Sequence, residues 1–186
     1  MARILILYST TDGHTLVICR RLRQLIEQHD HQVTLISLDN EVQPDLTLFD
    51  KFVIGASVRY GKHQAQVYEF IKENAQLLDR KPNAFFTVNV VARKPDKNQP
   101  ETNPYLRKFL QQVPWQPKQL AVFAGKIDYP KYNFWDRQII RLIMWLTKGP
   151  TDLKTVVEYT NWKQVEAFAL LVCEMKKVNR GQTTVS

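Results

Sequence analysis

The sequence predicts an α/β protein built around a doubly wound, five-stranded parallel sheet. Apolar runs of strand length alternate with amphipathic helical patterns along most of the chain, as βαβ units require. Several of these runs are continuously apolar, which is typical of strands covered by helices on both faces. With 186 residues, the chain is long enough for one domain with a substantial hydrophobic core.

Five apolar runs have the length of a strand. They are RILILY (3–8), QVTLIS (32–37), KFVIGA (51–56), AFFTVNVV (84–91) and LAVFAG (120–125). In open α/β sheets, ligands bind beyond the carboxyl ends of the strands, where the strand order reverses. The loops that begin near residues 8, 57, 88 and 126 are therefore the expected site of function.

Four helical patterns accompany these strands, and each places apolar residues on one helix face. They cover residues 14–29, 63–78, 102–112 and about 161–178. Thr160 or Asn161 is the expected N-cap of the last helix. Together these elements predict a single domain over residues 1–178, followed by a frayed polar tail at residues 179–186.

An insertion at about residues 128–155 breaks the alternation of strand and helix. It separates LAVFAG from VVEYT (156–160) and contains two tryptophans, two tyrosines and several basic residues. Within it, FWDRQIIRLIMWL (134–146) predicts a helix with a wide apolar face and a narrow polar side. A long insertion in a compact domain usually has a function.

The chain is basic, with a formal net charge of +8 and a pI near 9.5. Such a charge suits nucleic acid, a membrane surface or an anionic small molecule. The aromatic residues fall in strands and in one apolar helix, whereas nucleic-acid binding calls for aromatics along an exposed basic stripe, so we expect no nucleic-acid partner.

Other bulk features favour the cytoplasm. The apolar run at the start is too short for a signal peptide and predicts a buried strand. No run of eighteen apolar residues occurs, so no membrane span is expected. Cys19 and Cys173 belong to no metal or redox motif and are expected to be buried thiols.

The densest cluster of hydroxyl groups, YSTTDGHT (8–15), follows the first strand. This loop leads into the N-terminus of a helix, where unpaired backbone N–H groups and the helix dipole favour an anion. The side-chain hydroxyls add neutral donors, and Gly13 permits a tight turn. The loop therefore predicts a phosphate site, although an ordinary helix cap with chance hydroxyls remains the alternative.

The phosphate loop lacks both GxxxxGK[ST] and GxGxxG, so it is neither a nucleoside-triphosphate loop nor a dinucleotide fingerprint. Asp12 would repel a phosphate, so we expect it to point outward or to cap the helix. His14 is expected to be solvated. No metal-ligand spacing is present in the sequence, and no metal is predicted.

Several motifs resemble known proteins. YSTTDGHT resembles the FMN-phosphate loop of flavodoxin-like proteins, and VIGASVRYG (53–61) looks like their second flavin loop. IGASVRYGKH, VNVVARKP, TNPYLRKFL and YPKYNFWDRQIIRLIM together resemble the bacterial menaquinone-dependent protoporphyrinogen IX dehydrogenases, from residue 3 to about 172.

That resemblance implies a flavodoxin-like fold whose last strand is interrupted by the insertion. It also implies FMN as cofactor and the oxidation of protoporphyrinogen IX to protoporphyrin IX in haem biosynthesis. The electrons would pass to menaquinone or a related quinone. A cytoplasmic protein held peripherally at the inner membrane, with an oligomer possible, is the expected setting.

The resemblance further implies three flavin-binding loops. Their residues are Ser9, Thr10, Thr11, Asp12, Gly13, His14 and Thr15; Ser57, Val58, Arg59, Tyr60 and Gly61; and Thr87, Val88, Asn89, Val90 and Val91.

Catalysis would then rest on the flavin, and the sequence offers few protein groups for it. Arg59 and His63 are the weak catalytic candidates; His63 could relay a proton, but we expect it at the surface. The two propionates of the porphyrinogen would suit basic residues near these loops. The candidates are Arg59, Lys62, Arg93 and Lys94, with solvated surface charges as the alternative.

The insertion supplies the remaining contacts. Its helix, roughly fifteen residues and about 22 Å long, is too short to span a bilayer but could lie in the membrane interface. Packing on the core or on another subunit is the alternative. The expected substrate or membrane contacts are Arg93, Lys94, Tyr132, Trp135, Arg137, Arg141 and Trp145.

Two other functions fit parts of the sequence. The first is a flavodoxin-type electron carrier, and the second is another quinone-linked FMN reductase. Carriers of the flavodoxin class tend to be acidic, so the pI near 9.5 counts against the first.

Overall fold

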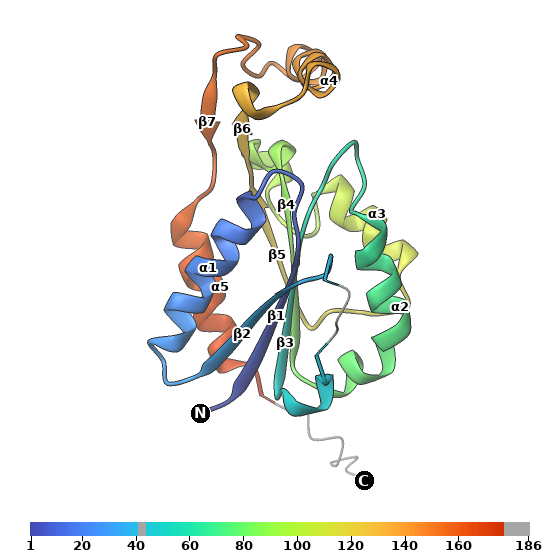
Figure 1. Ribbon diagram of the computed structural model, residues 1–186, viewed down its shortest axis with the longest axis vertical. Helices are drawn as coiled ribbons and strands as arrows, with labels where there is room; N and C mark the ends of the chain where they lie inside the picture. The colour runs from blue at the N-terminus through green and yellow to red at the C-terminus, as the bar shows by residue number, and fades with distance from the viewer. Residues whose placement is uncertain (41–43, 177–186) are drawn as a thin grey trace, which may run out of the picture.

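The computed structural model describes residues 1–40 and 44–176, and the tail predicted at 179–186 lies outside them. The central sheet has five parallel strands in the order β2-β1-β3-β4-β5 (Figure 1). The strands are β1 (Arg3–Ser9), β2 (Gln32–Ser37), β3 (Lys51–Ser57), β4 (Asn83–Asn89) and β5 (Gln119–Ala124). The predicted fold class is confirmed.

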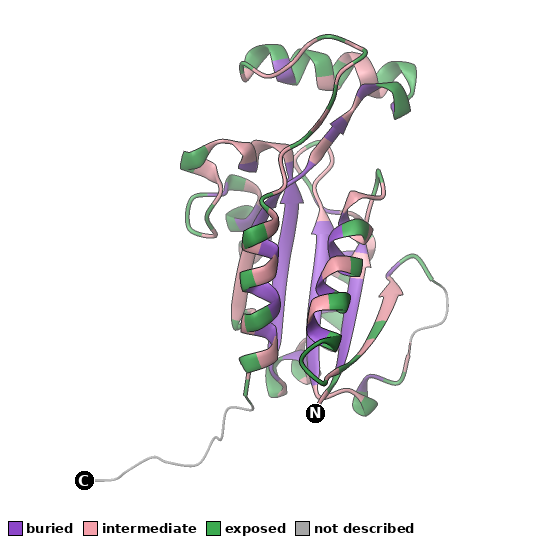
Figure 2. Cartoon of the chain, turned by 90° about the vertical axis from the view of Figure 1, so that its left-hand side faces the viewer, coloured by how far each residue is buried: buried purple, intermediate pink, exposed green. Residues whose placement is uncertain are grey.

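Two helical layers cover the sheet. Helices α1 (His14–Glu27) and α5 (Trp162–Glu174) lie on one face, and α2 (Ala65–Arg80) and α3 (Pro104–Gln112) lie on the other (Figure 1). Figure 2 shows the central strands buried and the edge strand β2 only partly buried, while the helices expose their outer sides. The continuously apolar runs therefore became strands because both of their faces enter a core. Asn161 caps α5 by accepting from the backbone N–H of Lys163.

Close packing is visible where β3 meets β4. A Cβ atom on Gly55 would lie 2.1 Å from the ring of Phe86, so only glycine fits this position. The strand predicted at residues 84–91 ends earlier, at Asn89. The side chain of Asn89 accepts from the backbone N–H of Ala92 and starts the 3-10 helix η2 (Val90–Arg93), because a polar side chain competes with the strand ladder.

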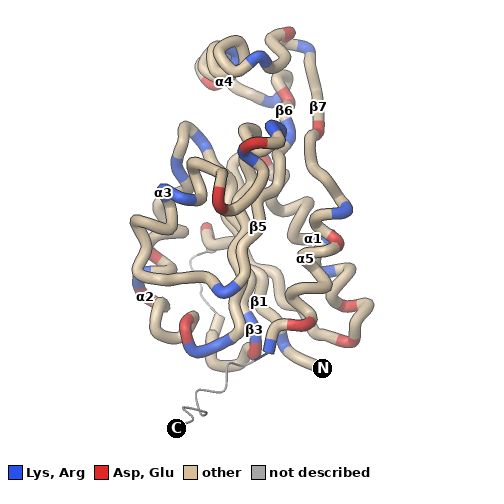
Figure 3. Tube along the Cα trace, turned by 180° about the vertical axis from the view of Figure 1, so that it is seen from behind, with Lys and Arg blue, Asp and Glu red and all other residues tan. Residues whose placement is uncertain are grey.

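The insertion forms a separate arm, which we define as residues 126–158. It contains β6 (Lys126–Asp128), α4 (Phe134–Leu146) and β7 (Val156–Glu158). Among the described residues the two strands pair only with each other and are antiparallel, so VVE does not rejoin the parallel sheet as the second half of an interrupted strand. The arm stands beyond the carboxyl ends of the main strands in both Figure 1 and Figure 3.

The arm has a small core of its own. Ile127, Tyr129, Tyr132 and Met144 are buried together, and Val90 of the domain packs against them.

The two cysteines are free; Cys19 is buried, as predicted, and Cys173 is half-buried. No helix within residues 1–40 and 44–176 is long and apolar enough to cross a membrane.

Candidate functional site

The site lies where the strand order reverses. Strand β1 has β2 on one side and β3 on the other, so the connections that leave these strands diverge and open a crevice at their carboxyl ends. The loops after β1, β3, β4 and β5 meet at this crevice, and the arm stands above it. Two adjoining cavities occupy it.

The smaller cavity, of about 50 Å³, is mostly polar in its residue types. It is lined by Thr10, Thr11, Asp12, His14, Thr15, Ser57, Val58, Val88, Asn89, Val90, Gly125 and Lys126. The first loop supplies five of these residues, and the predicted second and third flavin loops supply five more. The structure thus brings together three loops that the sequence predicted to share one site.

The hydroxyl loop is shaped to receive an anion. Gly13 adopts a left-handed conformation with φ of 82°, and its N–H donates to Thr10 Oγ1 at 3.0 Å. The N–H of Thr11 donates to Ser57 Oγ at 3.2 Å, which ties the first loop to the second. Thr15 Oγ1 is buried without a hydrogen-bond partner among the described residues. An unpaired hydroxyl in such a cavity is costly unless a ligand satisfies it.

Asp12 is exposed, as one of its two predicted roles requires, and His14 differs from its predicted position. Asp12 does not cap α1; its carboxylate forms an ion pair with Arg59 at 2.8 Å. Burial raises the pKa of Asp12, and the guanidinium of Arg59 opposes that rise. His14 is half-buried, and its Nε2 lies 2.6 Å from Thr160 Oγ1, so the expected solvated position is wrong. Burial lowers the pKa of His14 and favours the neutral ring.

The larger cavity, of about 480 Å³, extends from the smaller one to the arm. The two share Asp12, Val58, Asn89, Val90 and Lys126. The other lining residues are Arg59, Tyr60, Gly61, Val91, Tyr105, Tyr132, Ile140, Ile143 and Met144. The volume falls in the range of small-molecule sites, and helix α4 contributes an apolar wall.

The second loop is a tight turn. The backbones of Arg59 and Lys62 exchange hydrogen bonds at 2.8 and 3.1 Å. Between them, Tyr60 has φ of 50° and Gly61 has φ of 77°, a combination that defines a two-residue hairpin turn. A left-handed tyrosine is uncommon, and this strained backbone fixes Tyr60 at the edge of the larger cavity.

Arg59 lies at the centre of a charged cluster. Its guanidinium contacts Asp12 of the first loop at 2.8 Å and Asp136 of α4 at 2.7 Å. The hydroxyl of Tyr60 also donates to the carboxylate of Asp136. The guanidinium carbon lies 5.4 Å from the ring centre of Tyr60 and 5.1 Å from that of Tyr132, within the range of a cation–π contact.

His63 and Thr87 do not reach the cavities. His63 is buried, its Nε2 lies 3.0 Å from Thr87 Oγ1, and its ring packs 4.7 Å from that of Phe109. The expected surface position of His63 is therefore wrong. Burial lowers the pKa of His63 to about 4, so the ring is neutral near pH 7. Both side chains stabilise the core behind the site and line neither cavity.

Comparisons with known proteins agree with this geometry. A flavodoxin domain model matches residues 5–154. A protoporphyrinogen IX dehydrogenase [quinone] of Escherichia coli strain K12 is 42% identical over 167 residues, which cover 90% of this chain and 92% of that protein. One of Leishmania major is 42% identical over 168 residues, covering 90% of this chain and 73% of that protein.

The chain belongs to the quinone-dependent protoporphyrinogen IX dehydrogenase family. It is thus an oxidoreductase with a flavodoxin domain, as the motifs predicted. A solved archaeal flavodoxin shares the fold, with a TM-score of 0.51, 14% identity, and coverage of 92% of this chain and 96% of that one.

Within this family member, the structure divides the predicted substrate or membrane contacts. Tyr132 is buried and lines the larger cavity, whereas Trp135, Arg141 and Trp145 are exposed on α4. Arg137 donates to the carbonyl of Tyr132 at 3.0 Å.

Arg93 and Lys94 are not brought to either cavity. Arg93 donates to Thr147 at the end of α4, to its carbonyl at 3.1 Å and its hydroxyl at 2.9 Å, and so fixes the arm to the domain. Lys62, a further propionate candidate, is exposed in the turn after Arg59.

Ser9 has a supporting position. It is fully buried, and its hydroxyl donates to Gln64, whose amide in turn donates to Thr11 Oγ1 at 3.4 Å. The lining residues that the sequence did not identify are Tyr105, Gly125, Lys126, Ile140, Ile143 and Met144. Lys126 begins the fourth loop expected at the site, which was a usable signal. For the residues of α4 there was no such signal, because it is the folding of the arm over the crevice that brings them to the cavity.

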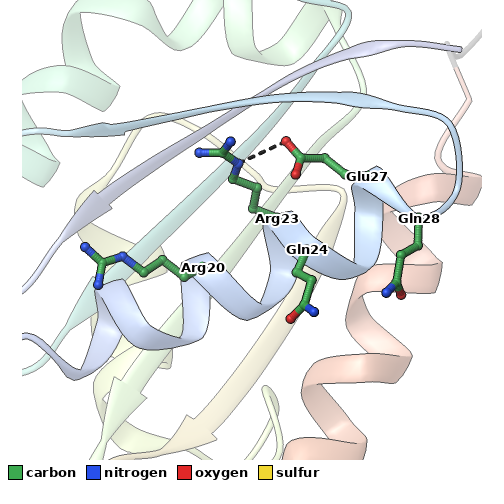
Figure 4. A pocket seen from close by; sticks show the side chains of 5 residues that line it. All are labelled: Arg20, Arg23, Gln24, Glu27 and Gln28. Carbon is green, nitrogen blue, oxygen red and sulfur yellow. Dashed lines mark hydrogen bonds and ion pairs between the residues drawn. The ribbon is translucent and has the colours of Figure 1, made fainter.

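One further hollow, of about 580 Å³, carries no site. Figure 4 shows its lining residues Arg20, Arg23, Gln24, Glu27 and Gln28 along the outer side of α1, with the ion pair between Arg23 and Glu27 at 2.9 Å. All five side chains are exposed and lie on α1 or at its C-cap, Gln28. Within the described residues, no group of His, Cys, Asp or Glu is arranged to hold a metal ion.

Proposed function

We propose that this protein oxidises protoporphyrinogen IX to protoporphyrin IX with bound FMN and passes the electrons to a membrane quinone, menaquinone being the expected acceptor. The observation that carries the proposal is the pair of joined cavities. A cradle of hydroxyls at a helix N-terminus leads into a wider cleft with an apolar wall. The relatives reported above are named protoporphyrinogen IX dehydrogenase [quinone], which supports the substrate and the class of acceptor.

The donor set suits the phosphate of FMN. The start of α1 offers backbone N–H groups, and Thr15 Oγ1 is a buried hydroxyl in need of a partner. Thr10, Thr11 and Ser57 surround it with further neutral donors, and Lys126 adds a cation at the rim. When bound, FMN supplies a ring that accepts the electrons of the porphyrinogen and releases them to the quinone.

The larger cleft suits the flat, apolar ring systems of the flavin and its partners. Val58 and Tyr60 border it from the second loop, Val90 and Val91 from the third. Ile140, Ile143 and Met144 of α4 close it from above. These side chains hold a ring in place by apolar contact and limit the access of water to it.

The outer face of α4 supports contact with the inner membrane. Its large apolar side chains are Phe134 (63% exposed), Trp135 (74%), Leu142 (56%), Trp145 (67%) and Leu146 (66%). Figure 2 shows α4 largely exposed along its length. An apolar patch of this kind marks an interaction surface, and tryptophans favour the headgroup region of a bilayer. Arg141 and Lys148 are exposed nearby and suit an anionic leaflet.

The first test is spectroscopic. The purified protein should carry a flavin absorption spectrum. Anaerobic addition of protoporphyrinogen IX should bleach it, and a menaquinone analogue should restore it. A flavin that stays oxidised in the presence of the porphyrinogen would contradict the enzyme and leave an electron carrier as the better interpretation. Absence of bound flavin would contradict both.

A variant tests the phosphate cradle. Thr15→Val should weaken FMN binding about ten- to a hundredfold while leaving riboflavin binding unchanged, because only FMN carries the phosphate and a charge-assisted hydrogen bond contributes roughly 1.5–3 kcal/mol. Thr102→Val, at an exposed position outside both cavities, is the matched control. Equal losses for FMN and riboflavin would show that Thr15 does not contact the phosphate.

A further inference from the structure

The charged cluster around Arg59 has the composition of a carboxylate-binding site. One carboxylate, that of Asp136, is held by the Arg59 guanidinium at 2.7 Å and by the Tyr60 hydroxyl. The strained turn places these two donors side by side at the cavity edge, and both line the larger cavity. Guanidinium and phenol groups are the donors that recognise a ligand carboxylate in many binding sites.

The carboxylate now held there comes from the arm. Asp136 lies in the first turn of α4, and its backbone N–H donates to the Asn133 cap at 2.9 Å. Its carboxylate would therefore remain favourable without Arg59, because the N-terminus of a helix stabilises a negative charge. Asp136 can release the guanidinium without becoming an unpaired buried charge, since its side chain is 25% exposed.

The contacts of Arg59 also permit exchange. Arg59 contacts two carboxylates, Asp12 and Asp136, so this cluster carries one negative charge in excess when both are ionised. A ligand carboxylate that replaced Asp136 would preserve the number of contacts to Arg59.

We propose that Arg59 and Tyr60 form the carboxylate-binding subsite of the cleft and that Asp136 occupies it in the free protein, as a stand-in for a carboxylate of the substrate. The inference rests on the proposed function, because protoporphyrinogen IX brings two propionates to a site whose ring contacts are apolar.

The other basic residues near the cleft are less suited to this role. Within the described part of the chain, Lys126 is the second cation that lines the larger cavity, and its ammonium group lies 3.3 Å from Asp128. Arg93 and Arg137 donate to backbone carbonyls of the arm. Arg59 alone among these combines a neighbouring phenol with a carboxylate partner supplied by a separate segment.

The experiment compares two ligands on the FMN-loaded full chain. Protoporphyrin IX and its dimethyl ester share one ring system, but only the diacid carries propionate charges. Binding is followed by porphyrin fluorescence, which does not require turnover. Asp136→Asn should tighten binding of the diacid about tenfold and leave the ester unchanged, because the internal competitor is gone. Glu166→Gln, which removes the partner of Arg21 at 2.7 Å on α5, is the matched control and should change neither affinity.

Two further variants remove the proposed donors. Tyr60→Phe keeps the ring and should weaken diacid binding severalfold. Arg59→Gln should abolish the preference for diacid over ester, and adding Asp136→Asn to it should produce no further gain. FMN content and thermal melting show whether each variant is folded, and Tyr60→Phe preserves the test should Arg59→Gln unfold the loop.

The outcomes separate the two proposals. Equal changes for diacid and ester, or an unchanged diacid affinity in Asp136→Asn, would overturn the subsite while a porphyrinogen-bleached flavin still supported the enzyme. Failure of the wild-type protein to bind either porphyrin, together with a flavin that porphyrinogen does not bleach, would overturn both.

Discussion

Helices α4 and α5 each contain 13 residues, yet α5 buries its apolar side chains and α4 exposes most of its own. Helix α5 buries Val165, Phe168, Ala169 and Val172 against the sheet. Helix α4 buries Met144 alone among its described residues and exposes a row of large apolar groups. The parallel sheet and its covering helices are thus stabilised by their own core, whereas the arm leaves large apolar side chains exposed.

Deletion of the arm should have the largest effect on activity. Replacing residues 131–149 by a short Gly-Ser linker should lower kcat/KM for protoporphyrinogen at least about a hundredfold, because the apolar wall that α4 contributes to the larger cavity disappears. FMN should still bind, since the smaller cavity takes no residue from this segment. The measurements are turnover, FMN stoichiometry and sedimentation with vesicles. Unchanged kinetics and sedimentation would contradict a role for the arm.

A matched pair of leucines sharpens the contrast in stability. Leu22 of α1 is fully buried, and Leu142 of α4 is 56% exposed. Leu22→Ala should lower the free energy of unfolding by about 2–5 kcal/mol, and Leu142→Ala by at most about 0.5 kcal/mol. Chemical denaturation of the FMN-loaded protein measures both. A comparable loss at Leu142 would mean that the arm is packed as firmly as the sandwich.

The sandwich was predictable because its signals are local. Continuous apolar runs gave all five strands, and the spacing of apolar residues gave the helices on both faces. The early end of β4 required knowledge that the Asn89 side chain would capture the N–H of Ala92, a contact that apolar pattern does not reveal. The antiparallel pairing of β6 with β7 likewise joins segments that lie on either side of the whole insertion.

The site was predictable in its phosphate loop and much less so elsewhere. Arg59 and Asp12 are separated by 47 residues, and Tyr60 and Asp136 by 76. The predicted strand ends place the loops of Asp12 and Arg59 at one edge of the sheet, but nothing in the sequence indicates their ion pair or the contact of Tyr60 with the arm. His63 stands between Lys62 and Gln64, a polar setting typical of the surface, but the start of α2 turns its ring toward Phe85 and Phe109.

The buried position of His63 makes a prediction about acid stability. Its pKa is about 4 in the folded protein and near 6.5 when unfolded, so below pH 6.5 the unfolded chain binds the proton more readily. Stability should therefore fall as the pH decreases from 6.5 to about 4, by roughly 3 kcal/mol, and the contribution of His63 should be constant below that.

The control for this prediction is a pair of variants. His63→Gln should remove most of the loss between pH 6.5 and 4, whereas His29→Gln, at an exposed position, should retain it. Urea denaturation at several pH values measures the difference. A wild-type protein whose stability followed that of His63→Gln across this range would show that His63 is hydrated in solution.

The last prediction concerns vesicle binding by the outer face of the arm. Trp135→Ala should weaken binding to anionic vesicles about tenfold, because a tryptophan that is 74% exposed in the free protein would lose its place among the headgroups. Leu170→Ala, at a 47% exposed position on α5, should leave vesicle binding unchanged and is the matched control. Equal sedimentation of the two variants would mean that the apolar surface of α4 faces a protein and not a bilayer, and the contrast between α4 and α5 would then describe an interface between chains.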